Sequence, residues 1–238
     1  MKRTDIIEKL RAFPYGKDEY WLITGGAMVL YGIRAETHDI DLGCTPEMAD
    51  RLESEGYLCK TAPDGNRCFK IGGDIEVFEN WLCGSAVNVD GIPVISIEGL
   101  VEMKRALGRD KDIKDIRLIE DFLRRTERAR EIIGKTVCGK IDRPAGSRHP
   151  EYADMIYPVN YGYVSDVTGG DGEEQDVYVL GTDAPIPDFE GKVIAVYRRF
   201  DDVEDKWIVS LGGTDYTDEE ILKAIDFQEK YFDGELLR

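Results

Sequence analysis

Two sets of acidic residues in this sequence have the spacing of ligands for a hard cation. The first is Asp39 and Asp41 in the segment HDIDLG, where residues two apart in an extended strand face the same side. Their oxygens suit Mg²⁺, which takes oxygen ligands and leaves positions open for substrate phosphates. Gly25 and Gly26 precede them at a predicted strand-to-helix turn, where backbone N–H groups can hold a triphosphate. Together these residues indicate phosphoryl or nucleotidyl transfer.

The second set lies in the segment DGEEQD, directly before the strand-like run VYVLG. Asp171, Glu173 and Asp176 lie so close in the sequence that they would repel one another unless cations neutralised them. An acidic run follows in FDDVEDKW. If the two acidic segments face each other across metal ions, phosphate oxygens could be held by nearby basic and tyrosine side chains, namely Lys206, Arg148, Tyr157 and Tyr161.

The overall composition is that of a globular protein with a strong acidic excess. The 238 residues carry a formal net charge of −17, which argues against non-specific binding to nucleic acid or to anionic membranes. The excess is uneven, because residues 1–128 contain 19 basic and 24 acidic residues and residues 129–238 contain 12 and 24. No apolar run reaches the length of a membrane span, and the charged N-terminal segment does not resemble a signal peptide, so we expect a cytoplasmic protein. The five cysteines lack a CxxC pair, which predicts reduced and mostly buried thiols.

The elements that must position these residues change character along the chain. Up to about residue 130, predicted strands such as YWLITGG and HDIDLGC alternate with helices, and GGDIEVF belongs to a pair of short strands or one bent strand. A helical region runs from about Ile97 to Ile133, with a break at Gly108. Beyond it, short β-rich runs predict a small barrel, closed by a helix from about Asp218 that has the capping box Thr217 and Glu220. We therefore expect an α+β protein with two rigidly joined domains, 1–130 and 131–238.

The N-terminal constellation resembles the nucleotidyltransferase superfamily over about residues 20–120. Its glycine pair, the interval of about a dozen residues and the Asp-x-Asp strand carry over as Gly25, Gly26, Asp39 and Asp41. The resemblance implies a polymerase-β-like α/β domain that transfers a nucleotidyl group from an NTP with Mg²⁺. It also implies a third carboxylate on a later strand, with Glu76 as first choice and Asp74 as second. The segment MKRALGRDKDIKDI adds candidate phosphate ligands, Lys104, Arg109 and Lys111.

The C-terminal half resembles family I soluble inorganic pyrophosphatase over nearly all of residues 134–238. The segments that carry the resemblance are YPVNYGYV and DGEEQDVYVL. It implies a small OB-like barrel with a terminal helix. It also implies that Asp176 is a general base or bridging ligand, that Lys206 binds phosphate, and that phosphate contacts come from Tyr157, Tyr161 and Tyr231. The implied metal ligands are Asp171, Glu173, Asp176, Asp201 and Asp205, with Glu204 as the alternative to Asp205.

Part of the basic complement expected from that family is missing. The phosphate arginine is either Arg143 or Arg148, and Phe232 occupies the place of a lysine after Tyr231. The tyrosines also have an alternative role, because alternating strand tyrosines commonly pack in a core.

The combined hypothesis is an enzyme that hydrolyses pyrophosphate and also transfers a nucleotidyl group to an acceptor that the sequence does not identify. The acidic surface favours a small molecule or a protein side chain over tRNA as the acceptor. The alternative is a regulatory, toxin–antitoxin-like protein that binds nucleotide and in which one or both sites have lost activity. A homo-oligomer is compatible with either hypothesis.

Overall fold

The computed structural model describes residues 1–62, 65–152 and 154–238. The chain divides into two compact units, Met1–Leu123 (unit 1) and Arg124–Arg238 (unit 2), and each is α+β in content. The division falls within helix α5 (Asp110–Ile132), a few residues before the boundary predicted near residue 130.

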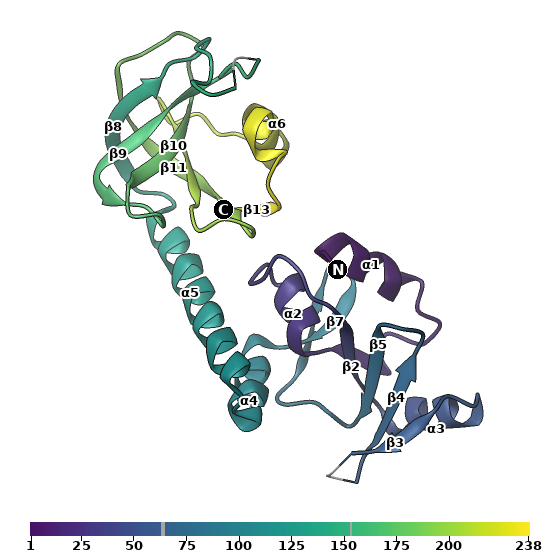
Figure 1. Ribbon diagram of the computed structural model, residues 1–238. Helices are drawn as coiled ribbons and strands as arrows, with labels where there is room; N and C mark the ends of the chain where they lie inside the picture. Colours follow the sequence, from purple (N-terminus) through teal and green to yellow (C-terminus); the bar gives the residue numbers. More distant parts are fainter. Residues whose placement is uncertain (63–64, 153) are drawn as a thin grey trace. The chain divides into compact units, whose positions relative to one another are not determined.

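Unit 1 is built on a seven-stranded mixed sheet with the strand order β3-β4-β5-β2-β1-β7-β6 (Figure 1). The strands are β1 (Tyr20–Leu22), β2 (Ile40–Cys44), β3 (Cys59–Thr61), β4 (Arg67–Ile71), β5 (Ile75–Glu79), β6 (Ala86–Val89) and β7 (Ile92–Ile95). The helices are α1 (Arg3–Arg11), α2 (Thr24–Leu30), α3 (Pro46–Ser54) and α4 (Ile97–Leu107), followed by the start of α5. Strand β2 pairs in parallel with β5 and antiparallel with β1, which places it in the middle of the sheet.

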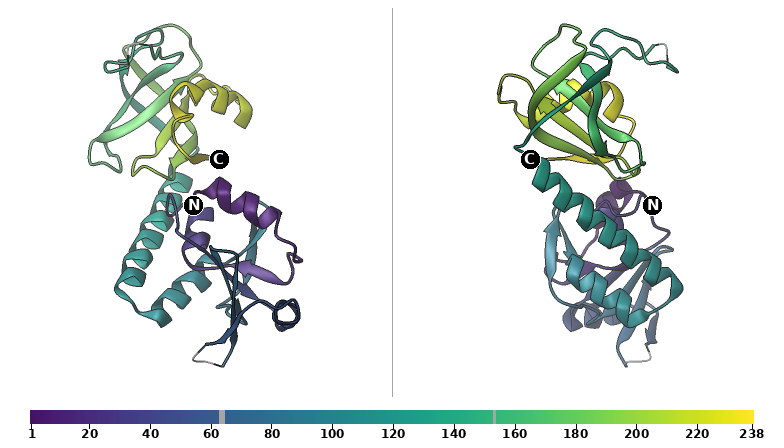
Figure 2. Two further views of the ribbon diagram at one scale, coloured as in Figure 1. Left: turned by 45° about the vertical axis from the view of Figure 1, so that its right-hand side comes forward. Right: turned by 90° about the vertical axis from the view of Figure 1, so that its left-hand side faces the viewer.

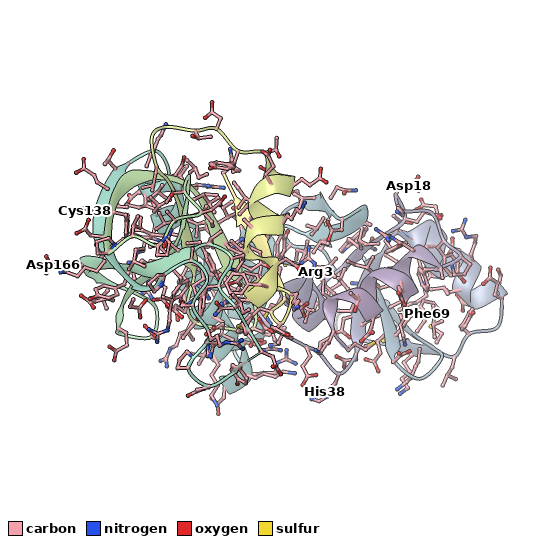
Figure 3. The ribbon with its side chains drawn as sticks, turned by 90° about the horizontal axis from the view of Figure 1, so that it is seen from above. Arg3, Asp18, His38, Phe69, Cys138 and Asp166 are labelled. Atoms are coloured by element: carbon pink, nitrogen blue, oxygen red, sulfur yellow. The ribbon has the colours of Figure 1, made fainter. Side chains whose placement is uncertain are left out.

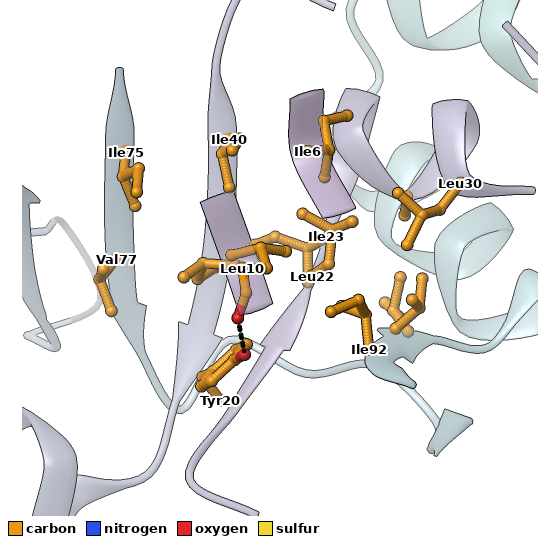
Figure 4. Packing of buried hydrophobic residues seen from close by; sticks show 14 of the residues in the cluster. Ile6, Leu10, Tyr20, Leu22, Ile23, Leu30, Ile40, Ile75, Val77 and Ile92 are labelled. Atoms are coloured by element: carbon orange, nitrogen blue, oxygen red, sulfur yellow. Dashed lines mark hydrogen bonds between the residues drawn. The ribbon is translucent and has the colours of Figure 1, made fainter. Parts of the chain in front are cut away.

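The core of unit 1 is formed by this sheet and the apolar faces of helices α1, α2, α3 and α4, with Ile119 of α5. Figure 4 shows Ile6 and Leu10 of α1 packed with Leu22, Ile23 and other aliphatic side chains of the cluster. The Tyr20 hydroxyl donates a hydrogen bond to the Leu10 carbonyl at 3.2 Å, so the polar atom of this buried ring is satisfied.

Local signals explain several of the element boundaries in unit 1. Thr45 caps α3 by accepting a hydrogen bond from the Met48 amide, and Ser96 caps α4 in the same way from Gly99. Gly108 has a φ of +62° and ends α4, as the break predicted there requires. The sequence analysis did not identify the β6–β7 hairpin.

Unit 2 is a closed barrel of five strands. They are β8 (Thr136–Arg143), β9 (Asn160–Thr168), β10 (Glu174–Leu180), β11 (Asp188–Arg199) and β12 (Lys206–Ser210). The order β12-β10-β9-β8-β11 is closed by pairing between β11 and β12, and β13 (Gly234–Leu237) adds to β11. The expectation of a small barrel is confirmed, although β13 was not predicted.

Helix α6 (Asp218–Glu229) packs against this barrel (Figure 2). Its capping box forms as predicted, with the Thr217 hydroxyl accepting from the Glu220 amide and the Glu220 carboxylate accepting from the Thr217 amide. Ile221 and Ile225 bury their side chains in one cluster with Tyr178 of β10. The helix therefore covers the part of the barrel from which the tyrosines extend.

The cysteines are less buried than the sequence analysis predicted. All five are free, but only Cys44 is buried, and Cys138 is exposed on the outside of the barrel (Figure 3). Strand β8 alternates between exposed and half-buried residues, and Cys138 falls on its exposed side. Among the residues that the structure describes, no helix is long and apolar enough to cross a bilayer.

We predict that Gly162→Ala, in the segment YPVNYGYV, destabilises unit 2 by about 1 to 3 kcal/mol. A Cβ at Gly162 would lie 1.9 Å from the Lys140 carbonyl oxygen of the neighbouring strand, so the strands would have to separate. The control is Gly73→Ala, whose added methyl group meets no atom within 4 Å. Denaturant unfolding followed by circular dichroism measures both, and equal stabilities would contradict the prediction.

Candidate functional site

In unit 2, the register of three strands brings Tyr161, Asp176 and Lys206 together. Strand β9 pairs with β10 so that Asp176 lies opposite Tyr163. Tyr161 is two residues before Tyr163 and therefore faces the same side of the strand. Strand β10 pairs in parallel with β12, with Val177 opposite Trp207, so Asp176 and Lys206 are neighbours. Residues far apart in the sequence therefore meet on three neighbouring strands of the barrel.

Lys206 is the centre of this cluster. Its ammonium group donates hydrogen bonds to Asp176 Oδ2 at 2.5 Å, to Tyr161 Oη at 3.1 Å and to Glu204. Tyr161 in turn donates to Asp176. The Lys206 side chain is only 3% exposed, so these contacts replace its hydration.

The cluster separates the two carboxyls by their pKa values. Burial opposes ionisation of Asp176, but Lys206 and the hydrogen bonds from its neighbours lower the pKa of Asp176 below its ordinary value. Burial and the hydrogen bond shared with Asp176 raise the pKa of Glu204 to about 7, against the effect of Lys206. Burial and the Asp176 charge raise the pKa of Tyr161, which therefore remains a phenol. At neutral pH the site therefore holds an ionised Asp176 beside the protonated groups of Lys206 and Tyr161.

Two residues at the end of β8 extend the cluster. Arg143 of β8 lies opposite Tyr161 of β9, after a bulge in β8 at Asp142. The side chains of Arg143 and Asp142 form an ion pair at 2.8 Å. Partial burial and the Asp176 charge raise the pKa of Asp142, while Arg143 lowers it. Burial raises the pKa of Tyr157, and Arg143, which shares a hydrogen bond with Tyr157, lowers it. The sequence analysis held Arg143 as one of two alternatives and did not identify Asp142, although both follow the strand-like run VCGKI.

Other residues predicted for this site are more exposed than the members of the cluster. Tyr231, just beyond α6, is 65% exposed, and its ring lies under the Lys230 ammonium group. Asp171 and Asp201 are exposed, and Asp171 accepts a hydrogen bond from the amide of Glu173, itself exposed. Arg148 is also exposed, in an isolated bridge with Ile156.

Of the two alternatives in the second acidic segment, the structure brings Glu204 to the cluster. Asp205 forms an ion pair with Arg125 of α5 instead. Glu204, two residues before Lys206, contacts the Lys206 ammonium group, whereas the Asp205 side chain between them contacts Arg125.

In unit 1, the glycine pair and the two aspartates lie at adjacent strand ends. Gly25 and Gly26 belong to the first turn of α2, and Thr24 before them has a φ of +51°, uncommon for threonine. The Thr24 hydroxyl donates to Asp41 Oδ2 at 2.5 Å, and the Ile23 amide donates to the Asp41 carbonyl. The sequence analysis missed Thr24, whose only signal was its place directly before the glycine pair.

The carboxylates of unit 1 raise the pKa of one of their members. Burial, Asp39 and Glu76 raise the pKa of Asp41, while Thr24 and Lys111 lower it. Glu76 of β5 lies directly opposite Asp41 of β2 in the parallel register. Asp74, the second choice, forms an ion pair with Lys9. Asp39, Asp41 and Glu76 thus form an acidic group whose chemistry fits a divalent cation.

The basic residues proposed from MKRALGRDKDIKDI have different environments. Lys104 is buried and bound to Asp115 at 2.7 Å, while the Arg109 Nε donates to Asp112 at 2.6 Å. Lys111 is exposed. Within residues 1–62, 65–152 and 154–238, no three or more His, Cys, Asp or Glu side chains are already arranged to hold a metal ion.

Comparisons with known proteins give similarities to two kinds of enzyme, each over part of the chain. No protein-family model matches the sequence, and no curated protein matches it. The inorganic pyrophosphatase of Helicobacter pylori is 18% identical, with 44% of this chain and 85% of that chain covered and a TM-score of 0.34. The pyrophosphatase of Ehrlichia chaffeensis is 19% identical, with 43% of this chain and 85% of that chain covered and a TM-score of 0.35. A Thermotoga maritima protein assigned provisionally as a nucleotidyltransferase is 20% identical, with 49% of this chain and 93% of that chain covered and a TM-score of 0.36.

The Glu204 pKa predicts a specific pH dependence of stability. Because its folded-state pKa is raised from 4.5 to about 7, the folded state binds more protons between these values, and the free energy of unfolding of unit 2 falls as pH rises. The lowered pKa of Asp176 acts below about pH 3.8, outside this window.

Glu204→Gln should therefore reduce the loss of stability between pH 4.5 and 7, because glutamine keeps the shape of the protonated acid and cannot ionise. Calorimetric unfolding across this range measures the effect, with exposed Glu190→Gln as the control. A slope in Glu204→Gln as steep as that of the wild type would show that another group titrates.

Proposed function

We propose that unit 2 hydrolyses inorganic pyrophosphate to two phosphates in a Mg²⁺-dependent reaction. The observation that carries the proposal is the buried contact of Lys206 with Asp176 and Tyr161. An ionised carboxylate can accept a proton from attacking water, and an ammonium group and a neutral phenol beside it can stabilise the negative charge that develops on a phosphoanhydride. The segment YPVNYGYV, by which this half resembles family I pyrophosphatases, supplies Tyr157 and Tyr161.

The roles follow from the protonation states. Asp176, kept ionised by Lys206, accepts the proton of the attacking water. With substrate bound, Lys206 and Tyr161 would each exchange one of their present hydrogen bonds for one to a phosphate oxygen that becomes more negative, and Arg143 adds a cation beside Tyr157. Glu204, protonated in part of the molecules at neutral pH, can donate to a phosphate oxygen or, once ionised, face a cation.

The acidic residues of the site fit Mg²⁺. Once Glu204 ionises, the site has three negative charges, on Asp142, Asp176 and Glu204, and two positive charges, on Lys206 and Arg143. The raised pKa values of Asp142 and Glu204 mean that their ionised forms are disfavoured until a further positive charge is added. These carboxylates would hold the metal ion, together with Asp171, Glu173 and Asp201 as the resemblance implies. When bound, Mg²⁺ supplies positive charge opposite the phosphate oxygens.

Asp176→Asn should reduce phosphate release from pyrophosphate at least about a hundredfold, because asparagine can neither accept the proton nor balance Lys206. The assay is phosphate release with saturating Mg²⁺. The matched control is Asp41→Asn in unit 1, which should leave the rate unchanged. If the wild-type protein shows no turnover with any divalent ion, unit 2 is a binding module and not an enzyme.

We further propose that unit 1 transfers a nucleotidyl group from an NTP to an acceptor. The specific observation is the acidic group of Asp39, Asp41 and Glu76, in which Glu76 lies opposite Asp41 in the strand register and burial, with the two neighbouring carboxylates, raises the pKa of Asp41 against the hydrogen bond from Thr24. This group would hold Mg²⁺ beside the glycine pair of α2. Release of pyrophosphate by unit 1 and its hydrolysis by unit 2 would make the transfer effectively irreversible.

Label from an α-³²P-NTP should be incorporated into an acceptor by the wild-type protein and not by Asp41→Asn or Glu76→Gln. Asp74→Asn is the matched control, because Asp74 precedes β5 and pairs with Lys9, whereas Glu76 lies directly opposite Asp41 in the strand register, although it also lies 3.8 Å from the Lys70 ammonium group. The acceptor panel comprises small hydroxyl and amine compounds, proteins and tRNA. NTP binding with no labelled acceptor would favour the regulatory, toxin–antitoxin-like alternative. Loss of transfer in Asp74→Asn, with transfer retained in Glu76→Gln, would show that Asp74 and not Glu76 is the third carboxylate.

A further inference from the structure

Arg34 lies beside the backbone of Gly25, on the loop that connects α2 to β2. A Cβ added to Gly25 would lie 2.8 Å from Thr37 Oγ1 and 3.6 Å from Arg34 Nη1. The other terminal nitrogen, Nη2, donates to Oδ1 of Asp115. The Arg34 side chain is 34% exposed, whereas that of Asp115 is 6% exposed. One edge of the guanidinium is thus held by a buried carboxylate, and the other borders the glycine pair.

Asp115 is fixed by a second cation. Lys104 Nζ donates to Asp115 Oδ2 at 2.7 Å, so each carboxylate oxygen of Asp115 binds a different basic side chain. Lys104 is 4% exposed and also lies 3.9 Å from Asp112 Oδ1. A buried carboxylate costs several kcal/mol unless it is paired, so Lys104 is needed where it is and is not available to a ligand.

Arg109 extends from the same buried group. It binds Asp112 through Nε, and about half of its side chain is exposed. Asp112 chiefly, and also Asp41 and Asp115, raise the pKa of Arg109. The buried set of Lys104, Asp112 and Asp115 therefore supports two partly exposed arginines on the side of unit 1 that carries Asp41.

We propose that Arg34 binds the triphosphate of the nucleotide in unit 1, that Asp115 is its positioning residue, and that buried Lys104 holds Asp115 in place. This inference rests on the nucleotidyl transfer proposed for unit 1. An arginine suits the role because its planar guanidinium has five donors, enough to bind a carboxylate on one edge and phosphate oxygens on another. The role assigned to Lys104 by the sequence, direct phosphate binding, passes to Arg34.

The test measures binding of ATP, CTP, GTP and UTP to the full chain by calorimetry with Mg²⁺. The same titrations are repeated in the Asp176→Asn background, so that any NTP binding in the site of unit 2 is recognised by its dependence on Asp176. Arg34→Ala should weaken binding of the preferred NTP at least about tenfold, since a charge-assisted hydrogen bond to phosphate is lost. Arg34→Lys should not restore it, because an ammonium group cannot contact Asp115 and the phosphate with two separate edges. Exposed Arg105→Ala on α4 is the matched control and should bind like the wild type.

Asp115→Asn tests the positioning role. It should weaken NTP binding, and the double variant with Arg34→Ala should bind no more weakly than Arg34→Ala alone, because both changes remove one interaction. Melting curves of each variant show whether unit 1 is folded. Additive losses, or NTP binding by folded Arg34→Ala within twofold of the wild type, would overturn the inference. If the wild type binds none of the four NTPs, the function proposed for unit 1 fails, a result distinct from retained binding in Arg34→Ala.

Discussion

A lysine buried against two carboxyls organises each unit of this protein. In unit 1, Lys104 lies between Asp112 and Asp115, and in unit 2 Lys206 lies between Asp176 and Glu204. Removing one partner from a buried ion pair costs about 3 to 5 kcal/mol, so each lysine restricts the positions of the acids around it. In unit 1 these contacts occupy Asp112 and Asp115, and in unit 2 they place a positive charge beside Asp176 and Glu204. The arrangement of the other residues in both sites depends on these two lysine contacts.

A second buried cation orders the acidic segment of unit 2. Arg199 at the end of β11 binds both oxygens of Glu229 in α6 at 2.8 Å and also binds Asp202 at 2.8 Å. Tyr178 donates to Glu229, and the Phe232 ring lies 3.6 Å from the Arg199 guanidinium. Phe232, where the resemblance leads one to expect a lysine, thus covers a structural arginine. These contacts join the helix, the barrel and the acidic segment, so α6 supports the candidate site without placing Tyr231 in it.

Features that depend on neighbouring residues could be predicted from the sequence. The capping box of α6 and the left-handed end of α4 at Gly108 each involve a few consecutive residues, whereas β2 begins at Ile40 and leaves Asp39 outside the strand predicted for it. The small barrel was also predictable, because short β-rich runs separated by Gly, Pro and Asp have few other solutions. The β6–β7 hairpin was not predicted, since its exposed strand β6 lacks a hydrophobic pattern.

The sequence by itself determined which residue types are present for phosphate chemistry and which local elements carry them. The tertiary structure alone decided their partners: Glu204 and not Asp205 beside Lys206, Glu76 and not Asp74 opposite Asp41, and Asp115 as the support of Arg34. The Arg34–Asp115 and Arg125–Asp205 pairs join residues 81 and 80 positions apart. No local preference encodes such pairs, because the packing of α5 within each unit brings them together, and for Glu76 the strand register decides, since a shift of one residue would turn a different side chain toward Asp41.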